Sequence, residues 1–314
     1  MSGAKPEEPQ ETNPASLSAQ PLAEEIREKA GIGPGEGPTD QNIEAAVAGF
    51  AHQFHYWYTR VMANAVHDYR KLIIARINPF VRQVEFQGQS GAAVSERLVL
   101  DYSNRNFVTA GGWAIEKMAI ALGSNNAKAA AEGIDLHRID PKTGDQHLYV
   151  IKSGSVTRNS DILKALKAHA QKAEKLINQG GGKNRVFANY AVATCATSST
   201  YHEYIYRPSS AQFWSEVSDL EPSQALDLVR EIARAAGRVI KMDSKPHTDA
   251  LTMLTASYIE TELGSNEVDW AFIFDRNMRE KASWAHEDAK RHKRAREALK
   301  PTGYAFLKKV KGRE

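Results

Sequence analysis

One stretch of the sequence, from Glu96 to Thr197, constrains the fold more than any other because helix and strand patterns alternate along it. Its order reads helix, strand, strand, helix, strand. The two adjacent strands flank Pro141-Lys142-Thr143-Gly144, where proline and glycine favour a turn, so we interpret them as a β-hairpin. Residues 185–194 are rich in apolar and β-branched side chains, which is typical of a buried strand. The pattern predicts an α/β fold whose sheet has at least three strands.

The two helices of this stretch show apolar stripes at helical spacing. In residues 113–123 the stripe precedes Gly123, a natural helix stop, and Glu116 lies beside it near the buried edge. The second helix follows Asn159 or Ser160, either of which can cap it. Its stripe consists of Ile162, Leu166, Ala170, Ala173 and Ile177.

The register of the hairpin decides whether chemistry is possible there. If Asp140 pairs with Asp145 around a four-residue loop, Asp135 stands opposite Val150 and Gly133 stands opposite Lys152. Directly opposed residues share a face, and side chains alternate with period two. Asp135 and Lys152 would then be diagonal neighbours on one face, whereas a loop of three or five residues would separate them.

Two carboxylates, a main-chain carbonyl and a lysine suit phosphodiester hydrolysis. Oxygen ligands suit Mg²⁺, which keeps several waters and takes only one or two protein carboxylates. In this interpretation Asp135 and Glu116 supply the carboxylates, and Lys152 orients the attacking water and stabilises the developing charge. The alternative is a surface salt bridge between Asp135 and Lys152.

At these residues the sequence resembles the PD-(D/E)XK nuclease superfamily, and most closely its type II restriction endonuclease branch. The resemblance rests on the helix that bears Glu116, on Gly133-Ile134-Asp135, and on Tyr149-Val150-Ile151-Lys152-Ser153-Gly154. It implies a restriction-endonuclease-like core, with a central mixed sheet flanked by helices, in which Asp135 is the central metal ligand and Lys152 is the catalytic lysine. It also implies that Ile151 offers its main-chain carbonyl to the metal and that Glu116 is the accessory acid and second metal ligand.

The same resemblance implies an activity and partners. The expected function is site-specific hydrolysis of double-stranded DNA with Mg²⁺ as cofactor, for which Mn²⁺ substitutes. A homodimer is expected because two related active sites most simply cut both strands of a symmetric site. A cognate DNA methyltransferase that acts on the same site is a further expected partner.

Val150 departs from the family pattern. The family often carries Glu, Asp or Gln two positions before the lysine, and valine cannot coordinate a metal. Glu116 is the expected substitute, ahead of Glu132. Two alternatives stay open: a structure-selective or repair nuclease of the same superfamily, and a non-catalytic DNA-binding protein with a degenerate nuclease fold.

Charge is distributed unevenly along the chain. Residues 1–42 hold eight acidic and three basic side chains, a net charge of −5, whereas residues 276–314 hold thirteen basic and five acidic ones, a net charge of +8. The basic tail predicts contact with a polyanion, although a solvated helix has the same composition. The candidate DNA-binding residues are Ser155, Arg158, Asn159, Lys164, Lys290, Arg291, Lys293 and Arg294.

The expected organisation has four parts. Residues 1–41 form an acidic, proline-rich arm without fixed structure, in which residues 22–30 could form a short helix. Residues 42–95 form a helical region, 96–207 the catalytic core, and 208–314 a mainly helical region that ends in the basic tail. No apolar run is long enough to span a membrane, and the single cysteine, Cys195, fits a reducing compartment, so a cytoplasmic protein is expected.

Overall fold

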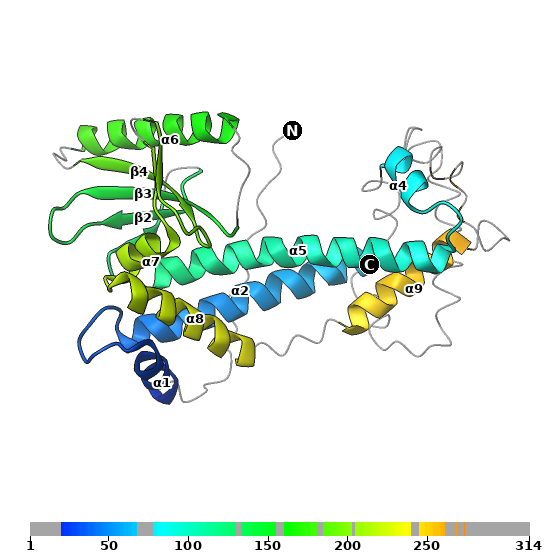
Figure 1. Cartoon of the computed structure of the whole chain (residues 1–314), viewed down its shortest axis with the longest axis horizontal. Helices are drawn as coiled ribbons and strands as arrows, with labels where there is room; N and C mark the ends of the chain where they lie inside the picture. Colours follow the sequence, from blue (N-terminus) through cyan, green and yellow to red (C-terminus); the bar gives the residue numbers. More distant parts are fainter. Residues whose placement is uncertain are drawn as a thin grey trace. The chain divides into compact units, whose positions relative to one another are not determined.

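The structure is a computed structural model that describes residues 20–67, 78–129, 133–154, 160–180, 185–202, 205–239 and 245–260, with Val268, Trp270 and Ile273. Its elements confirm the predicted α/β class (Figure 1). The chain divides into two compact units. One comprises Met1–Phe50 and Ile115–Val239, and the other comprises Ala51–Ala114 and Ile240–Glu314.

A six-stranded mixed sheet forms the centre of the first unit, in the order β1-β2-β3-β4-β6-β5. The strands are β1 (Asn126–Lys128), β2 (Leu136–Ile139), β3 (Gln146–Lys152), β4 (Val186–Val192), β5 (Ser199–His202) and β6 (Ile205–Arg207). Strands β1, β2 and β3 pair antiparallel, as do β5 and β6, whereas β4 is parallel to both β3 and β6. The predicted hairpin and a parallel crossover therefore meet at β3.

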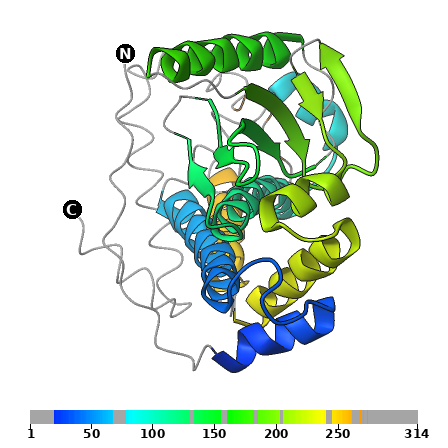
Figure 2. The same cartoon turned by 90° about the vertical axis from the view of Figure 1, so that its left-hand side faces the viewer.

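The crossover helix α6 (Ser160–Gln179) covers one face of this sheet (Figure 2). The predicted stripe on this helix is confirmed for Leu166, Ala170 and Ala173, which are buried against the sheet. Helix α7 (Ser210–Ser218) lies against the opposite face, where the Tyr149 ring packs on Phe213 with centroids 5.7 Å apart. Strand β3 is thus covered on both sides.

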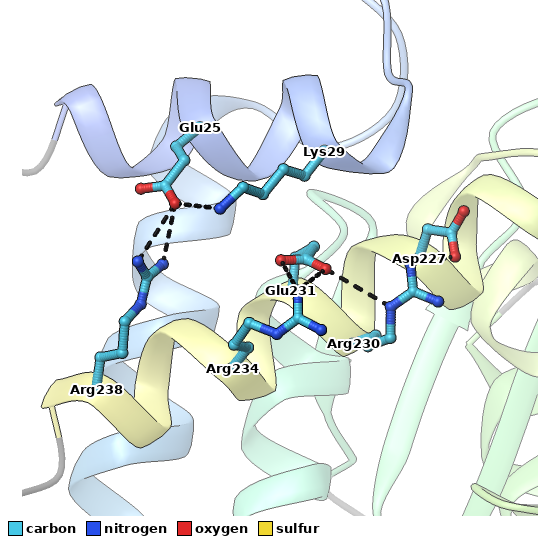
Figure 3. A network of polar contacts seen from close by, with 7 residues as sticks. All are labelled: Glu25, Lys29, Asp227, Arg230, Glu231, Arg234 and Arg238. Atoms are coloured by element: carbon cyan, nitrogen blue, oxygen red, sulfur yellow. Dashed lines mark hydrogen bonds and ion pairs between the residues drawn. The ribbon is translucent and has the colours of Figure 1, made fainter.

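Helix α8 (Pro222–Val239) joins helix α1 (Gln20–Ala30) through an apolar contact and an ion-pair network. Ala23 and Ile26 of α1 are buried. Figure 3 shows Glu25 accepting from Arg238 at 3.3 Å, and the buried Glu231 accepting from Arg234 at 2.8 and 3.0 Å. The expected short helix within residues 1–41 is present, and packing starts at α1 rather than near Asp40.

The second unit contains the remainder of helix α2 (Asp40–His67), helix α4 (Pro79–Glu85), most of helix α5 (Gly91–Ala121) and helix α9 (Lys245–Glu260). Asn78 caps helix α4, which begins at Pro79. The Asn78 side chain accepts from the amides of Phe80 and Val81, and proline is favourable in the first helical turn. Among the described helices, none combines the length and apolar character that a membrane span requires.

The helix expected over residues 113–123 is the end of α5, which stops at Ala121. Gly123 follows, where an added Cβ would lie 2.7 Å from the Val217 carbonyl of α7. The sequence did not predict β1, β5 or β6, because strands of three or four residues are too short to show an alternating pattern.

Candidate functional site at the end of strand β3

The carboxyl end of β3 carries the predicted motif, and its side chains alternate between two packed faces. The Tyr149 hydroxyl donates to Glu216 of α7 at 2.7 Å. Val150 points to the opposite face and belongs to the apolar cluster beneath α6. It is only 6% exposed, so this position serves packing and offers no metal ligand.

The hairpin register is the predicted one within the paired strands. Leu136 faces Tyr149 and Ile139 faces Gln146, and the Asp140 amide donates to the Asp145 carbonyl at 2.8 Å. The Asp140 carboxylate also accepts from the Lys142 and Thr143 amides, at 2.7 and 3.3 Å. These bonds hold the four-residue loop closed.

A β-bulge interrupts this register at Asp135. The Asp135 amide donates at 2.8 Å to the carbonyl of Tyr149, the residue that already faces Leu136, so two successive residues oppose one. Beyond this point Ile134 shares the α6 face with Val150. The expectation that Asp135 stands opposite Val150, and Gly133 opposite Lys152, is therefore wrong by one residue.

The bulge directs the Asp135 side chain back to β3. Its Oδ2 accepts a hydrogen bond from the Ile151 amide at 2.7 Å. In an uninterrupted ladder this amide would bond to a main-chain carbonyl of the neighbouring strand. Because the N–H and C=O of one residue in an extended strand point to the same side, the Ile151 carbonyl also faces the Asp135 edge.

Glu116 reaches the same place from the end of α5. Burial raises the pKa of its carboxyl, the charge of Asp135 raises it further, and Lys128, Lys117 and Lys152 lower it to a lesser extent. Burial likewise raises the pKa of Asp135, opposed by the Ile151 amide and by the charges of Lys152 and Lys128. The two carboxylates are both half-buried, and the charge of Asp135 disfavours the ionised form of Glu116.

Lys152 is the last residue of β3 and is half-buried. Its carbonyl accepts from the Ala193 amide at 2.8 Å, which ties its backbone to the segment that follows β4. Its ammonium charge acts on both Glu116 and Asp135. The structure therefore brings together the three side chains that the sequence singled out.

A family model described as Type II restriction endonuclease EcoO109I matches residues 46–239, which is 194 of the 314 residues. The chain belongs to this type II restriction endonuclease family. No curated protein matches the chain. The recognised resemblance is confirmed at the level of the family, and the matched residues include Glu116, Asp135, Ile151 and Lys152.

Lys128 of β1 is a residue of this restriction endonuclease's site that the sequence did not indicate. Its Nζ lies 3.9 Å from Glu116 Oε1, and its side chain is 65% exposed. It faces Leu136 across the β1–β2 pair, next to the bulge. The only signal in the sequence is a lysine a few residues after a helix stop, which is too common a feature to single it out.

The candidate DNA-binding residues of this restriction endonuclease fall into two groups. Lys164 is exposed on α6. The others lie outside the described residues, namely Ser155, Arg158, Asn159, Lys290, Arg291, Lys293 and Arg294.

The donor set of the site fits a hard divalent cation. Asp135 and Glu116 offer carboxylate oxygens, and the Ile151 carbonyl faces the same edge. Within the described part of the chain, no group of three or more His, Cys, Asp or Glu side chains could hold a metal ion. Two carboxylates match Mg²⁺, which takes few protein carboxylates, and their mutual repulsion is what a dication would relieve.

Proposed function

We propose that this restriction endonuclease hydrolyses phosphodiester bonds at specific sites in double-stranded DNA, and that it requires Mg²⁺. The observation that carries the proposal is the carboxylate of Asp135, which is directed by a bulge onto the Ile151 amide and shares its surroundings with Glu116 and Lys152. Bulges often re-aim a side chain beside an active site.

Asp135, Glu116 and the Ile151 carbonyl would hold the metal. Bound there, Mg²⁺ would lower the pKa of a water and offset the negative charge that develops on the scissile phosphate. Mn²⁺ has similar ligand preferences and is expected to substitute. The hydrogen bond from the Ile151 amide fixes one Asp135 oxygen and leaves the other for coordination.

Lys152 would act on the attacking water and on the phosphate. The backbone of Lys152 lies at the end of a strand that is bonded on both sides, so the point from which its side chain extends is fixed before the substrate arrives. Lys128 is more exposed, and we assign it contact with a phosphate next to the scissile one. Lys164, the loop around Ser155, Arg158 and Asn159, and the basic tail are the further proposed DNA contacts.

The proposed assembly is a cytoplasmic homodimer, because two related sites cut the two strands of a symmetric sequence most simply. A methyltransferase that modifies the same sequence is the proposed partner in the cell. The carboxylates of one active site serve one strand, so dimerisation supplies the second.

The second candidate is a DNA-binding protein that does not cut, and Val150 favours it. This side chain fills the core beneath α6 where related enzymes often carry a ligand. In the first candidate Glu116 replaces that ligand from α5. The two candidates differ in whether the carboxylates bind a metal that supports cleavage.

The test is cleavage of several unmethylated phage and plasmid DNAs, with Mg²⁺ or with chelator. The parent is compared with Asp135→Ala, Lys152→Ala and Lys142→Ala, the last of which changes an exposed lysine at the far end of the hairpin. Discrete fragments from the parent and from Lys142→Ala alone, and only with Mg²⁺, would support the proposal.

Other outcomes would overturn parts of it. A smear would indicate a non-specific or structure-selective nuclease. Intact DNA, bound equally by the parent and the variants, would identify a non-catalytic DNA-binding protein.

A further inference from the structure

Helix α6 touches the backbone that leads into the bulge. Gly133 has a positive φ of 81°, a conformation that disfavours any side chain. An added Cβ there would lie 3.1 Å from Nε2 and 3.2 Å from Cδ2 of His169, which belongs to α6. The imidazole therefore occupies the space beside Gly133 that a side chain would fill in any other residue.

Ile134 is held by the same helix. It is 4% exposed and packs in the cluster that contains Leu166 and Ala170, the residues that flank His169 on the face of α6 toward the sheet. Two consecutive residues before Asp135 are thus fixed from the α6 side, one by a ring and one by apolar packing.

These contacts determine where Asp135 points. The paired register would place Ile134 on the same face of the sheet as Leu136. Ile134 lies on the α6 face instead, and the bulge at Asp135 accommodates this change of face. The bulge in turn sets the carboxylate on the Ile151 amide. The His169 ring also affects the direction of Asp135, because it limits the backbone conformations that Gly133 can adopt.

We propose that His169 is a positioning residue of the active site, which acts through Gly133 and Ile134 to hold the Asp135 carboxylate on the Ile151 amide. This inference rests on the proposed function, since it assigns Asp135 as the central metal ligand. The role assigned to His169 requires no contact with DNA or metal. Residues that orient a metal ligand typically contribute 10- to 100-fold to metal affinity or activity.

The first test needs no activity. Hydrogen exchange of the Ile151 amide is followed by NMR in ¹⁵N-isoleucine-labelled full-length protein without metal. We expect protection in the parent and in Lys172→Ala, an exposed change on the same helix, and faster exchange in His169→Ala and in Asp135→Ala. Restored protection in His169→Phe, which keeps a ring over Gly133, would show that the ring is what matters.

The second test separates positioning from stability. In His169→Ala we expect Mn²⁺ binding to weaken about tenfold and the single-turnover cleavage rate to fall about 10- to 100-fold, with DNA affinity unchanged. Gly133→Ala should impair Mn²⁺ binding as well, and the double variant should lose less than the two single losses combined, because removing the ring relieves the contact with the new Cβ.

An Ile151 amide that exchanges equally in His169→Ala and in Lys172→Ala would overturn the inference. So would a folded His169→Ala protein that binds Mn²⁺ and cleaves DNA like the parent. A parent that binds no Mn²⁺ and cuts no DNA would instead overturn the proposed function, and the exchange experiment would still report whether His169 positions Asp135.

Discussion

Two groups of carboxylates in the first unit lie beside basic side chains, yet the pKa of Glu25 in one group and the pKa values of Glu116 and Asp135 in the other shift in opposite directions. On α1, hydrogen bonds from Lys29 and then Arg238 lower the pKa of Glu25. At the end of β3, burial raises the pKa of Glu116 and of Asp135 despite the nearby lysines. Figure 3 shows the first group, in which each carboxylate is paired with a lysine or an arginine.

The difference separates a structural ion-pair network from a site built to accept charge. Glu25 is exposed and its charge is already matched, so a cation would gain little there. Glu116 and Asp135 are half-buried and repel each other, which leaves negative charge that the protein neutralises only in part. A carboxylate pair of this kind stabilises the fold poorly, and under the proposed function a dication would relieve its repulsion.

The largest expected effect follows from removing the central carboxylate or the lysine. Asp135→Asn and Lys152→Ala should each lower the cleavage rate by about 10³-fold or more, because Asp135 would hold the metal and Lys152 would act on the attacking water and the phosphate. Single-turnover cleavage measures this loss. Glu25→Gln, its counterpart in the ion-pair network, should cleave like the parent. An equal loss in all three variants would end the distinction between the two groups.

The next effect concerns Val150. Restoring a carboxylate by Val150→Glu should not improve cleavage, because this side chain lies in the apolar cluster beneath α6. It should instead destabilise the protein by about 3 kcal/mol, the scale expected for a buried polar group without partners. Urea unfolding gives the value. Val150→Thr, which keeps the shape without a charge, is the control, and a Glu variant as stable as the Thr variant would show that the site lies elsewhere.

Glu116→Gln should lower the cleavage rate by a smaller factor, and it should raise the stability of the fold. Cleavage should fall by about 10- to 100-fold, while the free energy of unfolding at neutral pH rises by about 0.5 to 1 kcal/mol. The gain arises because burial holds the folded-state pKa of Glu116 above its unfolded value.

The pH dependence of that gain checks its origin. Between the two pKa values the folded state binds more protons than the unfolded state, so stability falls as pH rises through this window. Above its folded-state pKa, Glu116 lowers the free energy of unfolding by its full amount. Below its unfolded-state pKa, it does not lower it at all. Thermal unfolding from pH 3 to 8 should therefore show the stabilities of the parent and Glu116→Gln converge in acid. A constant difference would assign the gain to packing.

The smallest effect belongs to Glu25→Gln, and its pH dependence runs the other way. Because the pKa of Glu25 is lowered in the folded chain, its contribution is present above the unfolded pKa and is lost as pH falls through the folded one. Its carboxylate is exposed, so the variant should unfold close to the parent at every pH. A clear loss of stability confined to neutral pH would show that this network contributes more to the free energy of unfolding than surface ion pairs usually do.

Much of the fold could be predicted from local patterns. The sequence between Asp140 and Asp145 is typical of a turn, and the stripe on α6 shows which face of the helix is buried. The long α5 and the separate second unit escaped prediction. Their boundaries depend on packing between segments far apart in the chain.

The sequence singled out residues that the structure brings together, but it did not predict their geometry. Asp135 and Lys152 stand out by spacing, yet the bulge that aims Asp135 arises from competition between the β2–β3 ladder and packing against α6, which no local pattern contains. Lys128 was missed for the same reason. It joins the site only because the short strand β1 pairs with β2.

The central claim is that Asp135 and Glu116 together hold one divalent cation. Equilibrium binding of Mn²⁺, followed by electron paramagnetic resonance in the parent, Asp135→Asn, Glu116→Gln and Glu25→Gln, tests it without reference to cleavage. We expect one site per chain in the parent and in Glu25→Gln, with binding lost in Asp135→Asn and weakened in Glu116→Gln. Binding that is the same in the parent and in Asp135→Asn, or no binding in the parent, would contradict it.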